Sequence, residues 1–138
     1  MFEIHLPTKE ENSNVKKKNA NTREITFYSQ KCKSVVSVFG KAAKSLADKL
    51  ENDENILHYT SKIAFETNAS GIPIIGIRQS YIKEQWLSDF SVELIDGAIY
   101  IIEAIDAEDL KKKSEVEKLE LSRRYWNSKG IKWKLYVV

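Results

Sequence analysis

Two carboxylates, Asp89 and Glu103, are the residues of this sequence best placed to do chemistry. Glu103 is the charged residue in the apolar run "YIIEAI", residues 100–105, and Asp89 stands in "SDFSV", residues 88–92. Both runs have the character of half-buried strands, where a carboxylate is uncommon unless it caps or solvates a strand end or serves a site. If the two carboxylates share one face of a sheet, they could hold one metal ion between them.

The pairing of these two runs decides whether Asp89 and Glu103 meet. The runs flank Asp96-Gly97, a strong hairpin signal. A two-residue turn would set Asp89 opposite Ala104 and point Glu103 to the other face, whereas a three-residue loop with a left-handed glycine sets Asp89 opposite Glu103. A shared site requires the second register, or a bulge elsewhere that achieves the same. Ile105 follows Glu103 by two residues, so we expect both side chains on the same strand face.

The apolar patterns around this hairpin predict a mixed α/β domain, with a sheet flanked by helices. A first helix is expected over 36–51. A second helix should begin at Ser114, whose spacing from Glu117 matches a capping box, and should end at Gly130. Strands or extended segments are expected at 23–29, 55–59, 62–67 and 72–81, with a buried strand at 131–138.

Length and composition predict a single globular domain, since the chain has 138 residues, of which 42% are hydrophobic and 30% charged. Residues 1–22 are polar and lack periodicity, so we expect a flexible basic arm ahead of a domain at 23–138. The apolar runs are shorter than the roughly 20 residues that a membrane helix needs. With no secretory signal in the sequence, we expect a cytoplasmic protein. Cys32 is the single cysteine and excludes an internal disulfide.

Charge is distributed unevenly along the chain. Seven basic and three acidic residues lie between Lys9 and Lys33, and nine basic and three acidic residues lie between Lys111 and Lys134. In the segment 45–110 the balance reverses, with four basic and thirteen acidic residues. Basic ends suit a protein that lays its termini on a polyanion, although each lysine run taken alone also fits a solvated surface. The candidate DNA contacts are Lys16, Lys17, Lys18, Arg23, Lys31, Lys33, Lys111, Lys112 and Lys113.

From Arg23 to Val138 the order and spacing of motifs resemble the TnsA family, the endonuclease subunits of heteromeric cut-and-paste transposases. Family members tend to read F-P-S-x-K, L-L-E-x-D-P-x-V-x-x-Y, P-D-F, D-G, E-V-K or Q-V-K, and A-R-x-Y-C-x-x-x-G-W-x-F. The corresponding stretches here are "FYSQK", "KLENDENILHY", "SDF", "DG", "IEAI" and "SRRYWNSKGIKWKLYVV". The resemblance implies a restriction-endonuclease-like, PD-(D/E)xK core. The partners it implies are double-stranded DNA and transposase and ATPase subunits of a TnsB/TnsC type.

Such sites hydrolyse a phosphodiester with Mg²⁺ held by carboxylates, and the resemblance assigns Asp89 and Glu103 as catalytic metal ligands. Two further positions depart from the pattern. Ala43 stands where the family has a helix glutamate, and Ile105 stands where it has a lysine. An isoleucine neither donates a hydrogen bond nor stabilises a charge. Losing one such group typically costs ~10²–10³ in rate.

Three readings of function follow. The first is a TnsA-like, DNA-binding component of a transposition system whose catalytic set is degenerate, so that it is inactive or impaired. The second is an active Mg²⁺-dependent DNA endonuclease whose lysine has migrated, with Lys41 or Lys83 as candidates. The third is a protein-interaction module that reuses the fold, with exposed tryptophans as anchors; the candidates are Trp86, Trp126 and Trp133.

Overall fold

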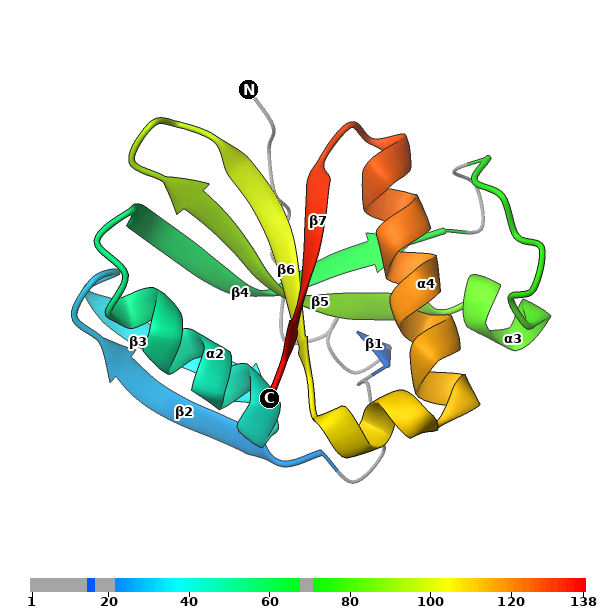
Figure 1. Cartoon of the computed structure of the whole chain (residues 1–138), viewed down its shortest axis with the longest axis horizontal. Helices are drawn as coiled ribbons and strands as arrows, with labels where there is room; N and C mark the ends of the chain where they lie inside the picture. The colour runs from blue at the N-terminus through cyan, green and yellow to red at the C-terminus, as the bar shows by residue number, and fades with distance from the viewer. Residues whose placement is uncertain (1–14, 17–21, 68–70) are drawn as a thin grey trace.

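The computed structural model describes residues 15–16, 22–67 and 71–138, and its elements are arranged around a twisted sheet (Figure 1). In chain order they are β1 (Val15–Lys16), β2 (Glu24–Ser29), β3 (Ser34–Phe39), α2 (Lys41–Glu51), β4 (Ile56–Glu66), α3 (Gln79–Ile82), β5 (Gln85–Leu94), β6 (Ile99–Ile105), η1 (Ala107–Lys111), α4 (Lys113–Ser128) and β7 (Lys132–Val137). The predicted mixed α/β architecture is confirmed. None of the helices in the described part of the chain has the length and apolar character of a membrane span.

The main sheet has five strands and is mixed. β5 pairs antiparallel with β4 along its whole length and with β6 over its second half, while β6 and β7 are parallel and joined through α4. β2 and β3 form a separate antiparallel hairpin. Since a parallel pair needs a crossover connection, α4 is the element that brings β7 beside β6.

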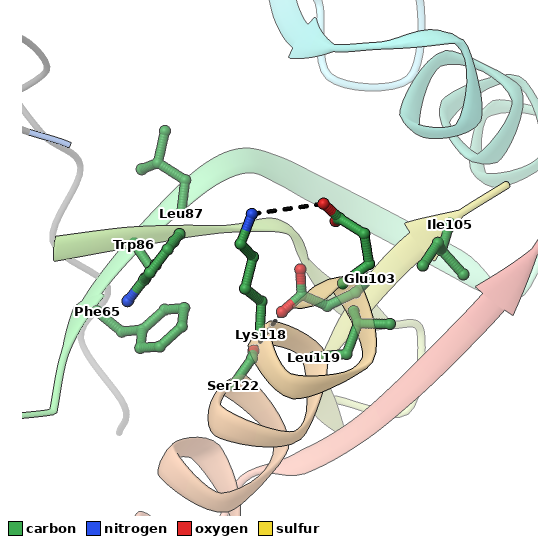
Figure 2. Close-up of a pocket in the computed structure, with 9 residues that line it drawn as sticks. Phe65, Trp86, Leu87, Glu103, Ile105, Lys118, Leu119 and Ser122 are labelled. Atoms are coloured by element: carbon green, nitrogen blue, oxygen red, sulfur yellow. Dashed lines mark hydrogen bonds and ion pairs between the residues drawn. The ribbon is translucent and has the colours of Figure 1, made fainter. Parts of the chain in front are cut away.

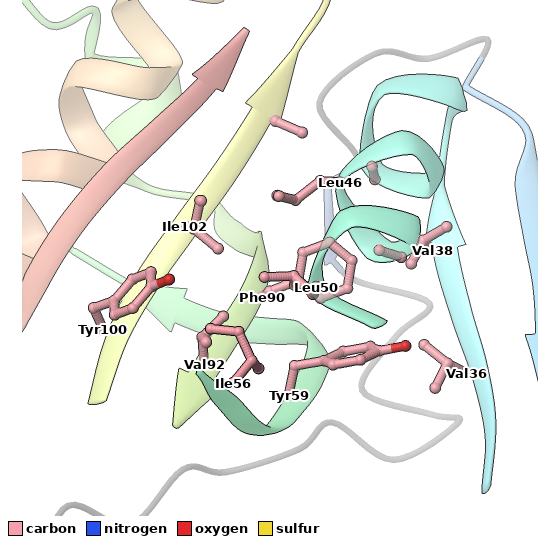
Figure 3. Packing of buried hydrophobic residues seen from close by; sticks show 13 residues of the cluster. Val36, Val38, Leu46, Leu50, Ile56, Tyr59, Phe90, Val92, Tyr100 and Ile102 are labelled. Atoms are coloured by element: carbon pink, nitrogen blue, oxygen red, sulfur yellow. The ribbon is translucent and has the colours of Figure 1, made fainter. Parts of the chain in front are cut away.

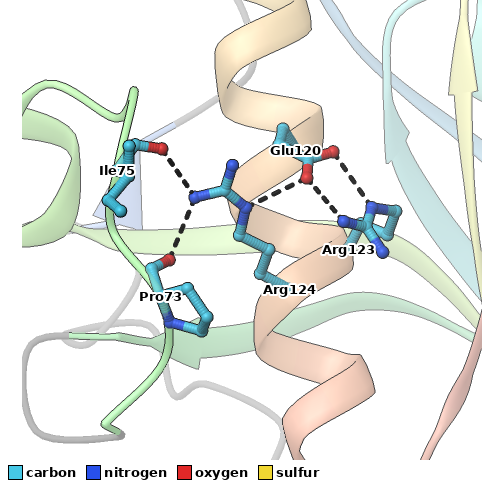
Figure 4. Close-up of polar contacts among 5 residues, drawn as sticks. All are labelled: Pro73, Ile75, Glu120, Arg123 and Arg124. Carbon is cyan, nitrogen blue, oxygen red and sulfur yellow. Dashed lines mark hydrogen bonds and ion pairs between the residues drawn. The ribbon is translucent and has the colours of Figure 1, made fainter.

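Two apolar clusters lie on opposite faces of this sheet. The first, here called the α2 core, joins α2 and β3 to the sheet, and Figure 3 shows Leu46, Leu50 and Phe90 at its centre. The second, the α4 core, joins Leu121 and Trp126 of α4 to residues of β4 and β5. β6 alternates regularly between them, since Ile102 belongs to the α2 core and Ile101 to the α4 core.

The β4–β5 ribbon contributes to both cores because its facing reverses midway. Phe90 packs in the α2 core, whereas Trp86, an even number of residues away, packs in the α4 core. Regular alternation would put both on one face. The reversal lies between the pairs Ser61–Phe90 and Ile63–Ser88, where Lys62 adopts φ 56°. Asp89 therefore stands at the point where β5 changes face.

A three-residue loop, residues 95–97, joins β5 to β6 and sets the register of this hairpin. Leu94 accepts a hydrogen bond from the Gly97 N–H at 2.9 Å and donates one to the carbonyl of Ala98 at 2.8 Å, and Gly97 has φ 91°. The pairs run from Glu93–Ile99 to Phe90–Ile102. Continued by one step, this register would set Asp89 opposite Glu103, but the ladder ends before that pair, where β5 changes face.

The secondary structure differs from the prediction in three places. The helix expected over 36–51 begins only at Lys41, because the preceding valines form β3 and pair with β2, and Gly40 with φ 91° separates strand from helix. The extended segment expected over 72–81 is a turn followed by the short helix α3. The two short strands expected at 55–59 and 62–67 are one continuous strand, β4, whose bend lies at Lys62.

The ends of the last helix and strand also differ from expectation. α4 begins at Lys113 after the 3-10 turn η1, so Ser114 lies inside the helix and no side chain caps its start. β7 is a strand, as predicted, but not a buried one. Among the described strands it pairs with β6 alone, and the side chains of Leu135 and Val137 are exposed.

The expected arm, residues 1–22, lies largely outside the described residues. Its two described strand residues, Val15–Lys16, form β1, which pairs in parallel with Gln85 and Trp86 of β5. The main sheet thus includes a short stretch of the arm.

Candidate functional site

Glu103 is fully enclosed and forms the centre of a hydrogen-bond network. Its side chain is 2% exposed, and its Oε2 accepts hydrogen bonds from the hydroxyls of Ser88, at 3.1 Å, and Ser122. The two serine oxygens in turn accept from indole N–H groups, Ser88 from Trp126 at 2.9 Å and Ser122 from Trp133 at 3.2 Å. A carboxylate of the sheet is thereby joined to α4 and β7.

A small cavity of about 20 Å³ lies between Glu103 and α4 (Figure 2). Ile105 lines it as well, so the prediction that Ile105 shares the face of Glu103 is confirmed. Two charged side chains of α4 also line it, Glu115 and Lys118, which form an ion pair at 3.4 Å. At the strand position where the family has a lysine, the cavity is lined by the apolar side chain of Ile105. A lysine of α4, Lys118, lines the same cavity.

Asp89 is held differently from Glu103. At the reversal of β5 its Oδ2 accepts a hydrogen bond of 2.7 Å from the backbone N–H of Ala104. The ladder between β5 and β6 ends at Phe90–Ile102, so this carboxylate accepts from an N–H just beyond the last paired residues. The small cavity is lined by Glu103, and Asp89 is not among its described lining residues.

The lysines expected to replace the missing strand lysine lie apart from Glu103. Lys41, at the start of α2, lines a second, open cavity of about 250 Å³, which it shares with Ile105, Asp106 and Glu115. Lys83 is exposed at the end of α3 and lines neither cavity. Of the two, only Lys41 is near the strand position that departs from the family pattern.

Ala43, where the motif alignment places the family's helix glutamate, is 2% exposed and packs in the α2 core. Ile105 is 5% exposed. Both departures from the four-group pattern are therefore apolar side chains, and both line the open cavity of about 250 Å³ that Lys41 also lines.

The described residues do not fit a resident Mg²⁺. Within 22–67 and 71–138, no three His, Cys, Asp or Glu side chains come close enough together to hold a metal ion. One oxygen of Glu103 is occupied by two hydroxyl donors, and an ammonium group lines the cavity beside it. Mg²⁺ prefers near-octahedral oxygen ligands and retains several waters, which this cavity lacks room for.

The candidate DNA contacts fall into three groups. Arg23, Lys33 and Lys113 are exposed. Lys111 and Lys112 are exposed as well and pair with acidic residues of η1, Lys111 with Glu108 and Lys112 with Asp109. Lys31 is bound to the domain instead, because its ammonium donates to the carbonyls of Asp53 and Ile56 at 2.8 and 2.6 Å. Lys17 and Lys18 lie outside the described residues, and only the backbone of Lys16 is described.

The tryptophans are not exposed anchors. Trp86 and Trp126 are 6% and 2% exposed, and Trp133 is half-buried with its N–H bound to Ser122. Their indole N–H groups all have acceptors inside the domain, since Trp86 donates to the carbonyl of Tyr81. The tryptophans that were candidate anchors of a protein-interaction module therefore pack inside the domain.

Sequence reasoning missed the residues that surround Glu103. Ser88 precedes Asp89 in "SDF" and carries no signal of its own. Lys118 and Ser122 follow Glu115 on one side of α4 at helical spacing, and this spacing reads equally as a surface ion pair. Only the packing of α4 on β5 and β6 shows that these side chains point inward.

Comparison with known proteins places the fold in a family. The profile described as "TnsA-like endonuclease N terminal" matches residues 47–137, about two thirds of the 138-residue chain. The match contains Asp89, Glu103 and Ile105 and begins after Ala43. A comparison with curated proteins gives no match. The matched region holds the strands β4 to β7 and the helix α4, and the chain belongs to the TnsA-like endonuclease N-terminal family.

Proposed function

We propose that the chain is a DNA-binding, nuclease-fold component of a Tn7-type transposition system, in which DNA cleavage is lost or slow. The observation that carries this proposal is the burial of Ala43 and Ile105 at two of the four positions of the family's site. Neither side chain can bind a metal or stabilise an anion. Glu103, the third position, is enclosed by hydroxyl donors.

DNA binding is supported by charge. Exposed basic residues remain on the described surface at Arg23, Lys33 and Lys113, and the undescribed arm adds a run of lysines. Phosphate neutralisation by such residues supplies most non-specific affinity for nucleic acid. Double-stranded DNA is the proposed ligand, and transposase and ATPase subunits of a TnsB/TnsC type are the proposed protein partners.

A paired binding and cleavage assay tests the proposal. Fluorescence anisotropy with labelled duplex DNA should show binding in the presence of a metal chelator, with an affinity that falls as salt rises. Supercoiled plasmid incubated with Mg²⁺ or Mn²⁺ should stay uncut, or be nicked slowly. Absence of salt-sensitive binding would overturn the proposed function.

An active endonuclease is the second candidate, and one observation favours it. Lys41 lines the open cavity together with Ile105, so a lysine does lie near the strand position that lacks one. Mg²⁺ bound through Asp89 and Glu103 belongs to this candidate. Efficient plasmid cleavage that is lost in both Asp89→Ala and Lys41→Ala would establish it.

A further inference from the structure

The small cavity beside Glu103 encloses an unusual set of charges. Its described lining includes two carboxylates, Glu103 and Glu115, and one ammonium, that of Lys118; its other described lining residues are uncharged. The side chains of Glu115 and Lys118 are 12% and 19% exposed, and Glu103 is 2% exposed. Charges this far from water are costly unless an opposite charge lies beside them.

Lys118 is held so that its charge stays at this cavity. On α4 it lies one turn after Glu115, its ion-pair partner at 3.4 Å, and one turn before Ser122, which donates to Glu103. Its ammonium also lies 5.8 Å from the ring centre of Trp86, within the range of a cation–π contact. The ion pair with Glu115 and the ring of Trp86 thus favour one position of a side chain that is otherwise flexible.

The size of the cavity argues against a second cation. Its volume of about 20 Å³ is close to that of a single water-sized probe. A bound Mg²⁺ usually keeps several waters, so it does not fit while Lys118 is in place. Lys118 already supplies one positive charge beside these two carboxylates.

We propose that Lys118 is a tethered counter-ion, whose ammonium takes the place of a divalent cation at Glu103 and Glu115 and makes the domain independent of metal. The inference deepens the proposed function, because it rests on the degenerate site and explains how the carboxylate Glu103 is kept. It also gives Lys118 a role in charge balance that differs from that of a catalytic lysine.

Replacing Lys118 by methionine tests the proposal, because Lys118→Met keeps an unbranched side chain and removes the charge. The melting temperature of the wild-type domain should not respond to Mn²⁺. The variant should melt lower in chelator and gain at least about 3 °C when saturating Mn²⁺ is added, since a cation can then bind the two carboxylates. The gain should vanish in the double variant Lys118→Met with Glu115→Gln.

Lys44→Met is the matched control, because Lys44 forms an ion pair with Asp48 on the exposed side of α2. It should gain no response to Mn²⁺. If Lys118→Met is unfolded in chelator, circular dichroism during Mn²⁺ titration replaces melting. Recovery of the fold with Mn²⁺ then supports the proposal, and a chain that stays unfolded at saturating Mn²⁺ overturns it.

Two further results would overturn the proposal that Lys118 is a tethered counter-ion. One is a Mn²⁺-dependent rise in the melting temperature of the wild type, which would mean that metal and Lys118 coexist. The other is a folded Lys118→Met variant that ignores Mn²⁺. DNA binding by the wild type in chelator is measured separately, so a failure of the proposed function is recognised independently of these melting experiments.

Discussion

The carboxylate of Glu103 is costly to bury and correspondingly costly to remove. Its two serine donors are themselves buried, Ser88 at 0% and Ser122 at 2% exposure, and each serine also accepts from an indole. The two serine oxygens lie 3.1 Å apart, so without Glu103 one hydroxyl could donate to the other, and the second would lose its acceptor. Glu103 therefore contributes to the stability of the fold through its hydrogen bonds with Ser88 and Ser122.

Glu103→Ala should lower the free energy of unfolding by about 2–4 kcal/mol, because it creates a cavity and leaves a buried hydroxyl donor without its acceptor. Glu103→Gln keeps an oxygen acceptor and should cost less. Urea denaturation measures both. Glu108→Ala, at an exposed residue of η1, is the control and should change stability by no more than about 0.5 kcal/mol. Equal losses for the Ala and Gln variants would show that the hydrogen bonds do not matter.

A second carboxylate, Glu51, gives the domain an acid-sensitive contact. It accepts hydrogen bonds from the hydroxyls of Tyr59 and Ser29, both at 2.7 Å, and from the backbone N–H of Lys31 at 2.6 Å. Burial alone would raise the pKa of Glu51, but these hydrogen bonds together outweigh it, and that pKa lies below its ordinary 4.5. The contact joins the end of α2 to β4 and to the turn after β2.

Because the pKa of Glu51 is lower in the folded state, its contribution to stability is present above the unfolded pKa and is lost as pH falls through the folded one. The free energy of unfolding should therefore drop below about pH 4.5. Glu51→Gln should be less stable near neutral pH and should show a shallower drop on acidification. Urea denaturation across this pH range measures the difference, with the exposed Glu54→Gln as the control. Parallel pH profiles for wild type and Glu51→Gln would contradict the assignment.

At the scale of elements, the β5–β6 hairpin depends on one backbone conformation. Gly97 has φ 91°, a region that residues with a Cβ rarely adopt, and beyond its two chain neighbours no described residue has an atom within 4 Å of the position that a Cβ would take. Any cost of substitution therefore comes from the backbone rather than from a clash. The register of the β5–β6 ladder follows from this loop.

Gly97→Val should destabilise the domain by about 1–2 kcal/mol, the cost of forcing a branched residue into a left-handed conformation. Thermal melting of the variant measures the loss. Ile95→Ala is the matched control in the same loop, since Ile95 is 64% exposed, and it should have little effect. A neutral Gly97→Val would mean that the hairpin can adopt another turn.

Sequence patterns predicted those elements whose signals are local. The hairpin follows from Asp96-Gly97 and its flanking strands, and the end of α4 follows from Gly130, which has φ 74°. The prediction for the stretch before α2 was wrong because its valines form a strand only when β2 pairs with them. That pairing is not a local property of the sequence.

The same distinction holds for the site. The register of the β5–β6 ladder could be predicted from the turn, and the shared face of Glu103 and Ile105 could be predicted from strand alternation. Lys118 could not be found, because its spacing from Glu115 is that of an ordinary surface pair. What places it inside is the docking of α4 on the sheet, which depends on side chains far apart in the sequence.

At the scale of the whole molecule, β1 changes what removal of the arm should do. Deleting residues 1–21 removes the strand that pairs with Gln85 and Trp86, so a loss of about 1–2 kcal/mol is expected in urea denaturation. Loss of its lysines should also flatten the salt dependence of DNA binding. Deleting residues 1–14 keeps β1 and three of these lysines and should leave stability unchanged. Identical stabilities for the two deletions would show that β1 adds nothing to the sheet.

The reversal of the β4–β5 ribbon also has a consequence for how the domain comes apart. One continuous pair of strands supplies Tyr59 and Phe90 to the α2 core and Phe65 and Trp86 to the α4 core. Neither core can open fully while the ribbon stays paired, so the two should be lost in one cooperative step. Amide hydrogen exchange should give the slowest β4 and β5 amides on either side of Lys62 the same opening free energy, as for a single folding unit.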